Sequence, residues 1–288
     1  MNRAFSWAAL AMASLVSTGG SAGAADNIAQ PWQLGLLPAA TPIAEKIHDF
    51  HTLLMWIITI ITLFVMGLMI WIAIRYRESV NPVPSKTTHN TLIEVIWTVV
   101  PVLILVVIAI PSFRLLKEQV VIPKSDMTIK ITGKQWYWSF EYAKDSGGIG
   151  FDVIMLTDED IAKAVKNGGK KEDYPRLLAV DNEVVVPVNK VVRVQVTAAD
   201  VIHAFAIQSF GVKIDAVPGR LNETWFKATK EGVFYGQCQE LCGKDHAFMP
   251  MAIRVVSQDK YDAWMKDAQK KFALSGDATT KVAATDAR

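Results

Sequence analysis

Near the end of the chain, two cysteines, a histidine and a methionine form the run Cys-x3-Cys-x3-His-x2-Met, at Cys238, Cys242, His246 and Met249. The two cysteines are the only ones among 288 residues. Thiolate, imidazole and thioether groups are ligands that select copper, and a mononuclear site of this kind uses two histidines, one cysteine and a weakly bound methionine. Because the run holds one cysteine more than that, it favours two metal ions bridged by two thiolates.

A second imidazole for such a site can be found by elimination. The chain has five histidines, His48, His51, His89, His203 and His246. The first three flank hydrophobic segments of the N-terminal half, which leaves His203 as the partner of His246. His203 follows the alternating segment Val191–Val196, which predicts a half-buried strand. A histidine at a strand end and a ligand cluster in a later loop are how a β-sandwich builds a copper site.

Other uses of the same residues remain open at this point. Cys238 and Cys242 could form a disulfide in an oxidising compartment. A zinc site with two cysteines and two histidines could use the same side chains, but it leaves Met249 without a role. His203 alone could be an ordinary core histidine. The joint presence of all these residue types favours copper.

Two segments of the N-terminal half, Thr52–Ile74 and Val95–Phe113, contain no charged residue. A helix needs about 20 apolar residues to cross a bilayer, and prolines such as those of the second segment are tolerated there. A content of 51% hydrophobic residues also fits a membrane protein. The sequence predicts transmembrane helices at residues 49–74 and 94–116, with the lipid bilayer around them.

The N-terminus has the pattern of a secretory signal peptide. A positive charge precedes an apolar stretch, and Ala22-Gly23-Ala24 has the small residues of a cleavage site. We therefore expect residues 1–24 to be removed. The loop between the spans, residues 75–93, carries an excess of basic residues, which places it in the cytoplasm. The segment 25–48 and everything after the second span then lie on the outer face.

The sequence beyond the second span predicts β-structure. Met127–Thr132 is one of several strand-like segments separated by glycine and proline. Asp158–Asn167 has helical spacing and predicts an inserted helix and loop, and Gln258–Phe272 predicts a last helix. We place the β-domain at residues 117–264. Residues 265–288 include a stretch rich in Ala, Thr and charge, and we expect them to be disordered.

Several segments, in the same order along the chain, resemble the motifs of cytochrome c oxidase subunit II. They are Glu94–Pro101, Gly133–Tyr142, Ala199–Phe205, Asp215–Asn222 and Gly236–Pro250. With the helix hairpin, the resemblance covers roughly residues 42–262. It implies an N-terminal two-helix transmembrane hairpin followed by an all-β, cupredoxin-like Greek-key sandwich or barrel. It further implies a bacterial inner-membrane protein, with its N-terminus and C-terminal domain in the periplasm.

The resemblance also implies a dinuclear copper A centre. In it, the thiolates of Cys238 and Cys242 bridge both ions, and two histidines each cap one copper. One copper is weakly bound by a thioether and the other by a main-chain carbonyl. These further ligands are His203, His246, Met249 and Glu240, the last by its carbonyl. The side chain of Glu240 is implied to hold a magnesium or manganese ion shared with subunit I, and a carboxylate suits such a hard ion.

Further residues receive roles from the resemblance alone. Trp136 corresponds to the residue at which electrons from cytochrome c enter. Glu141, Asp181 and Asp200 are implied to help dock cytochrome c. Glu94, at the cytoplasmic mouth of the second span, is implied to stand at the entrance of a proton path in subunit I.

The implied function is electron transfer rather than bond chemistry, because protein groups fill every ligand position. Electrons would pass from cytochrome c to the haem centres of subunit I, where O2 is reduced to water and protons are pumped. Subunits I and III are the expected membrane partners. No Cys-x-x-Cys-His motif attaches a haem to this chain, and no basic run with interleaved aromatics indicates nucleic-acid binding.

Three related classes of protein are weighed against this one. A quinol oxidase subunit lacks copper, and the complete cysteine and histidine set argues against it. A nitrous-oxide-reductase-type domain shares the copper loop, but the helix hairpin favours an oxidase. A membrane-tethered copper-handling protein would hold a single, exchangeable Cu(I).

Overall fold

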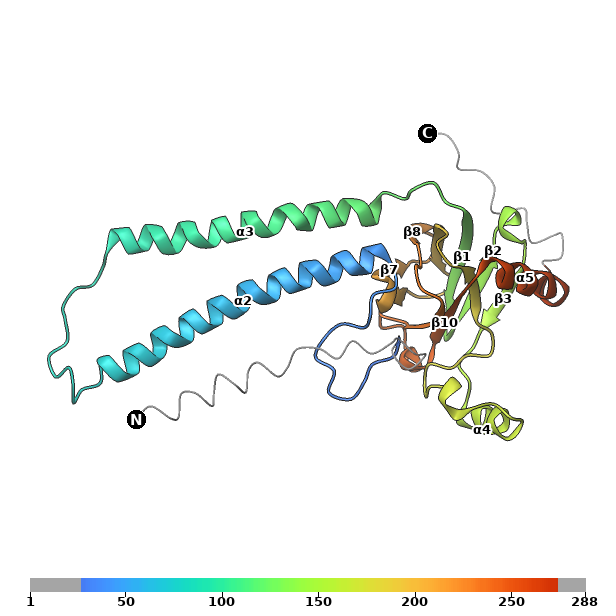
Figure 1. Cartoon of the computed structure of the whole chain (residues 1–288), viewed down its shortest axis with the longest axis horizontal. Coiled ribbons are helices and arrows are strands. Elements are labelled where there is room, and N and C mark those ends of the chain that lie inside the picture. Colours follow the sequence, from blue (N-terminus) through green and yellow to red (C-terminus); the bar gives the residue numbers. More distant parts are fainter. Residues whose placement is uncertain (1–26, 274–288) are drawn as a thin grey trace.

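Two long antiparallel helices extend from a β-sheet domain in the computed structural model, which describes residues 27–273 (Figure 1). Helix α2 spans Pro42–Arg75 and helix α3 spans Thr91–Val120. Both are long and apolar enough to cross a membrane, and their most apolar stretches are not buried within the chain. The predicted hairpin is confirmed, although each helix extends beyond the predicted spans at 49–74 and 94–116.

Helix α2 begins earlier than its apolar sequence predicts because the β-domain fixes its first turn. The hydroxyl of Thr41, the N-cap, accepts a hydrogen bond from the Ala44 N–H (3.0 Å) and donates one to the Phe210 carbonyl (2.7 Å). Polar residues then continue the helix toward the apolar span. An ion pair between Lys46 and Glu118 joins the two helices near the domain. The hairpin is therefore anchored to the domain at its base.

The β-domain contains all the strands that the structure describes. They are β1 Met127–Lys134, β2 Tyr137–Tyr142, β3 Gly150–Val153, β4 Val184–Pro187, β5 Val192–Ala198, β6 His203–Ile207, β7 Val212–Ala216, β8 Asn222–Phe226, β9 Gly232–Gln237 and β10 Pro250–Val256. Short 3-10 helices lie at Lys144–Ser146, Lys171–Asp173, Gln208–Phe210 and His246–Phe248.

Three sheets share one hydrophobic core. The largest has the strand order β3-β2-β1-β5-β8, and the others are β4-β10-β9 and β6-β7. Neighbouring strands are antiparallel, except that β1 runs parallel to β5 and β4 runs parallel to β10. Buried rings from different sheets, such as Phe140, Phe205 and Phe234, meet in the core. The predicted all-β domain is confirmed.

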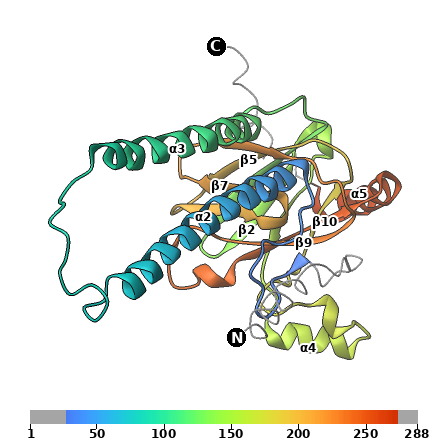
Figure 2. The same cartoon turned by 60° about the vertical axis from the view of Figure 1, so that its left-hand side comes forward.

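Two further helices lie at the periphery of this domain (Figures 1 and 2). Helix α4, Asp158–Lys166, begins with a capping box formed by Thr157 and Asp160, and it confirms the predicted inserted helix. Helix α5, Gln258–Phe272, confirms the predicted last helix.

The expectation that disorder begins at residue 265 is wrong. Met265 and Ala268 are buried against the domain, and the ring of Phe272 lies 4.8 Å from that of Phe151. Apolar contacts on one face of α5 therefore outweigh its charged composition. The predicted signal peptide, residues 1–24, and residues 274–288 of the predicted tail lie outside the described residues.

Replacing Tyr142 by Phe should lower the free energy of unfolding of the β-domain by about 1–3 kcal/mol. The buried Tyr142 hydroxyl donates to the Val185 carbonyl (2.8 Å) and accepts from the Val185 N–H (3.0 Å). Chemical denaturation of the purified chain in detergent, followed by near-ultraviolet circular dichroism, measures the change. Tyr137→Phe, on the same strand with a half-buried ring, is the control and should have little effect. Equal stability of the two variants would contradict the role given to the Tyr142 bonds.

Candidate metal centre

The donor residues singled out in the sequence meet where strand β6 begins and the connection between β9 and β10 passes. His203 is the first residue of β6, and Cys238 directly follows β9. His246 opens the 3-10 helix that precedes Met249, and β10 begins at the next residue. Strands that pack in the core therefore fix both ends of the cluster.

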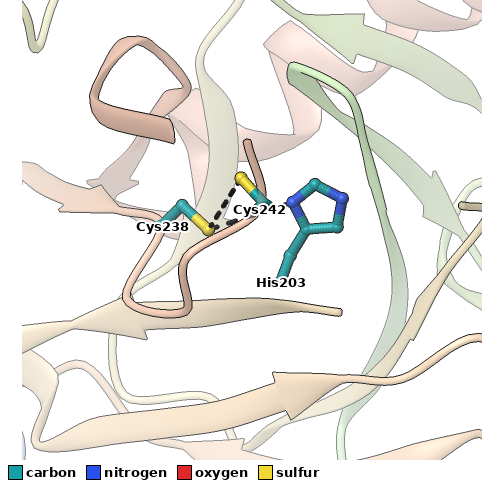
Figure 3. A group of neighbouring side chains, drawn as sticks. All are labelled: His203, Cys238 and Cys242. Atoms are coloured by element: carbon teal, nitrogen blue, oxygen red, sulfur yellow. Dashed lines mark hydrogen bonds between the residues drawn. The ribbon is translucent and has the colours of Figure 1, made fainter. Parts of the chain in front are cut away.

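Figure 3 shows His203 beside the two cysteines. The Sγ atoms of Cys238 and Cys242 lie 3.9 Å apart, and Cys238 Sγ lies 3.9 Å from the Nδ1 atom of His203. One ligand atom from each of the three residues lies within 4.8 Å of the others. Both cysteines are free, and their sulfurs are much farther apart than the roughly 2.05 Å of a disulfide bond. The arrangement fits sulfurs that share a metal rather than a bond.

Three more donor atoms surround the cysteine pair. The Sγ atom of Cys242 lies 3.5 Å from Nδ1 of His246 and 3.5 Å from the sulfur of Met249. The main-chain oxygen of Glu240 lies 3.3 Å from the Sγ atom of Cys238, while the Glu240 side chain is exposed. The sulfur of Met249 thus lies among the donor atoms. A zinc site made of cysteine and histidine alone would not use this sulfur.

Burial and proximity act differently on the two thiols. Burial raises the pKa of Cys238, but hydrogen bonding with His203 and with nearby main-chain groups outweighs it, so the pKa falls below its usual value. Burial, together with the neighbouring Cys238, raises the pKa of Cys242. One thiolate therefore forms readily, and the second needs a nearby positive charge. A metal ion supplies that charge and deprotonates a coordinating thiol.

Asp200 holds His203 in the orientation that the cluster requires. Its carboxylate lies 2.9 Å from His203 Nε2 and accepts hydrogen bonds from the N–H groups of Gln135 (2.6 Å) and Val201 (2.7 Å). Burial opposes the charge of Asp200, but these hydrogen bonds outweigh it and lower its pKa. The carboxylate binds the Nε2 side of the ring, so the Nδ1 atom faces the sulfurs. In metal-ligating histidines, the ring nitrogen that does not bind the metal is commonly held by a carboxylate in this way.

Trp136 lies against the same loop. Its indole N–H donates to the carbonyl oxygen of Cys242 (3.2 Å), and the Gln135 side-chain amide donates to the same oxygen (2.9 Å). Gly243 adopts φ +127°, and a Cβ atom there would come within 2.9 Å of the Trp136 ring. The half-buried indole is therefore one hydrogen bond away from a cysteine of the cluster.

Trp138 also supports the cluster, a role that the sequence analysis did not assign. Its fully buried ring lies 5.9 Å from that of His203, and its indole N–H donates to the Met249 carbonyl (3.0 Å). The aromatic run of β2 marks this tryptophan as a core residue, but its partners are distant in sequence. The run alone could not separate it from Trp136.

The predicted docking acids all have partners within the chain. Glu141 forms an ion pair with Lys130 (3.1 Å). Asp181 accepts hydrogen bonds from the N–H groups of Ile154 and Asn182, both at 2.8 Å. Asp200 is the one already described as bonded to His203. Each carboxylate therefore also has a structural role.

Glu94 lies in the first turn of α3, at the end of the hairpin remote from the β-domain (Figure 1). The structure therefore separates Glu94 from the donor cluster by the length of the helix. The side chain of Asn90 caps this helix end by accepting a hydrogen bond from Ile93 N–H (3.2 Å).

Comparison with known proteins gives consistent matches over most of the chain. The family model for the periplasmic domain of cytochrome c oxidase subunit II matches residues 127–256, and that for its transmembrane domain matches residues 29–115. A probable cytochrome c oxidase subunit 2 of Rickettsia bellii is 51% identical over 254 residues, which are 88% of this chain and 90% of that protein.

Two further proteins are similar to this chain. Cytochrome c oxidase subunit 2 of Cereibacter sphaeroides is 43% identical over 251 residues, covering 83% of this chain and 82% of that protein. A crystal structure of the periplasmic domain of cytochrome oxidase subunit II of Bradyrhizobium japonicum is 63% identical. It covers 53% of this chain and 100% of that domain, with a TM-score of 0.47.

The chain belongs to the cytochrome c oxidase subunit II family. It is a subunit of the cytochrome c oxidase complex, with two membrane-spanning helices and a periplasmic domain. The cluster of His203, Cys238, Cys242 and Met249 is consistent with the copper A site of such subunits.

Replacing Asp200 by Asn should weaken copper retention by about tenfold, because the carboxylate that orients His203 is lost. Competition between the copper-loaded chain and a chelator measures the loss. Asp259→Asn, at an exposed position in the first turn of α5, makes the same change on an element that holds none of the donor residues and should leave copper retention unaltered. If the two variants retain copper equally well, Asp200 does not act through His203.

Proposed function

We propose that the cluster binds a dinuclear copper A centre and that the chain is the electron-accepting subunit of the oxidase. The observation that carries the proposal is the pair of buried, free cysteines with sulfurs 3.9 Å apart. The Nδ1 atom of His203 lies 3.9 Å from the sulfur of Cys238, and that of His246 lies 3.5 Å from the sulfur of Cys242. Soft thiolate and thioether donors with imidazole suit copper.

The chain's own groups fit the requirements of such a centre. Cys238 and Cys242 would bridge the ions, His203 and His246 would cap one each, and Met249 and the Glu240 carbonyl would complete the set. When bound, the copper pair supplies a one-electron carrier. Burial of both cysteines and of Met249 keeps water away from the sulfur donors. Such a closed donor set leaves no position for a substrate, which favours electron transfer over bond chemistry.

Electrons would come from cytochrome c and enter at Trp136. The support is the hydrogen bond from its indole N–H to the carbonyl of Cys242, which links a half-buried surface ring directly to a cluster residue. Glu141, Asp181 and Asp200 would contribute negative charge to the docking surface. Because each is bonded within the chain, their charges are fixed in place before the donor arrives.

The electrons would continue to the haem centres of subunit I, which reduces O2 to water and couples this to proton pumping. The exposed Glu240 side chain would hold a magnesium or manganese ion with subunit I. Glu94 would stand at the entrance of a proton path on the cytoplasmic side. The exposed apolar faces of α2 and α3 would pack on subunit I and lipid, and subunit III is a further expected partner.

The orientation follows from the same proposal. The β-domain and the segment before α2 would lie in the periplasm of a bacterial cell, and the loop between Arg75 and Thr91 would lie in the cytoplasm. The basic residues of that loop support this orientation through the positive-inside rule.

The copper pair can be tested with methionine and cysteine variants of the copper-loaded chain. Cys238→Ser should abolish the electron paramagnetic resonance signal of an electron shared by two coppers, because one bridging sulfur is lost. Met249→Leu should keep a shared signal with altered parameters, since the thioether is a weak ligand. Met251→Leu, buried on β10 outside the cluster, should leave the signal unchanged. One copper per unaltered chain, with a localised signal after oxidation to Cu(II), would favour a copper-handling protein instead.

Trp136→Phe should slow reduction of the assembled oxidase by cytochrome c while leaving copper content and the resonance signal intact. The indole, with its hydrogen bond to the cluster, is the group removed. Stopped-flow reduction kinetics measure the effect. Trp225→Phe also removes an indole that donates to a main-chain carbonyl, that of Glu118 (3.2 Å), at the base of the hairpin. Equal reduction rates in the two variants would show that electrons do not enter at Trp136.

A further inference from the structure

Lys244 places a positive charge over the ring of Trp136. Its ammonium nitrogen lies 5.5 Å from the ring centroid, and its side chain is 78% exposed. The carboxylate of Asp245 lies 3.7 Å away, but an exposed ion pair of this kind is weak, so it does not hold the lysine away from an approaching donor. A donor that approaches Trp136 must therefore meet this ammonium group.

A second lysine lies over the neighbouring aromatic ring, that of Tyr137, but this lysine is less exposed. Lys134 lies 5.0 Å from the ring centroid of Tyr137, but its side chain is only 32% exposed and lies 4.0 Å from Asp152. Of the two lysines, Lys244 is thus the one whose charge faces solvent. Among the described residues, no other cationic side chain lies over the Trp136 ring.

We propose that Lys244 is a charge filter that selects among cytochromes c at the electron-accepting surface. A donor with a cationic side chain opposite Trp136 is disfavoured by like-charge repulsion, while one with a neutral or acidic group there is favoured. The inference deepens the proposed function and rests on Trp136 as the point at which electrons enter. Lys244 would act on docking alone, so it should change KM and leave kcat unaltered.

A purely local role for Lys244 makes a different prediction. If the lysine only packs on the indole, its removal would affect donors of either charge in the same direction. A charge filter must instead produce opposite effects with donors of opposite charge, and salt must screen both effects. The sign of the change therefore separates the two roles.

The test uses the assembled oxidase with a cationic cytochrome c and with the same cytochrome c after succinylation of its surface lysines. At low ionic strength, Lys244→Gln should lower KM about threefold for the cationic donor and raise KM for the succinylated one. Lys244→Arg keeps the charge and should keep the original KM values. Lys266→Gln, at an exposed position on α5, removes the same charge elsewhere and should change neither KM.

The proposal is overturned if Lys244→Gln behaves like Lys266→Gln or shifts KM for both donors in the same direction. Copper content and the resonance signal are measured on each variant, so that any loss of the copper loop is seen. The Trp136→Phe variant tests the underlying function separately. If that variant is reduced at the original rate, electrons enter elsewhere, whatever the Lys244 variants show.

Discussion

The structure depends on placing two thiols side by side in a buried loop. Burial opposes ionisation of both thiols, hydrogen bonds favour the Cys238 thiolate, and that thiolate raises the pKa of Cys242, so a cation between the two stabilises the state in which both are charged. The surrounding donors are imidazole nitrogens, a main-chain oxygen and a thioether, a set that suits a metal ion. The loop therefore has the donor atoms of a metal site, and a bound metal ion would balance the negative charge of the two thiolates.

The rest of the domain serves to hold this loop in place. Asp200 orients the ring of His203 through a hydrogen bond to Nε2. Trp138, on β2, donates a hydrogen bond to the main-chain carbonyl of Met249. Trp136, in the turn between β1 and β2, donates a hydrogen bond to the carbonyl of Cys242. Because these supports come from the β1–β2 hairpin and from the connection between β5 and β6, all within one packed domain, the donor atoms should move little between oxidation states. A rigid donor set lowers the cost of reorganisation, which is what a fast electron relay needs.

Much of the fold and of the cluster could be predicted because the signals are local. The cysteine–histidine–methionine run is a short segment, and long uncharged stretches identify the two spans. His203 required an argument by elimination, which worked because the chain has few histidines. The start of α2 could not be predicted, since the bond from Thr41 to Phe210 joins residues far apart in sequence. The same limit applies to Asp200. Its bonds with Val201 and His203 are local in sequence, but its third partner, Gln135, lies in the turn between β1 and β2.

The central claim is that two sulfurs join two copper ions, and X-ray absorption at the copper K-edge tests it most directly. On the copper-loaded chain, the account predicts sulfur and nitrogen neighbours around copper together with scattering from a second copper nearby. A spectrum with sulfur and nitrogen neighbours but no neighbouring copper would contradict the account.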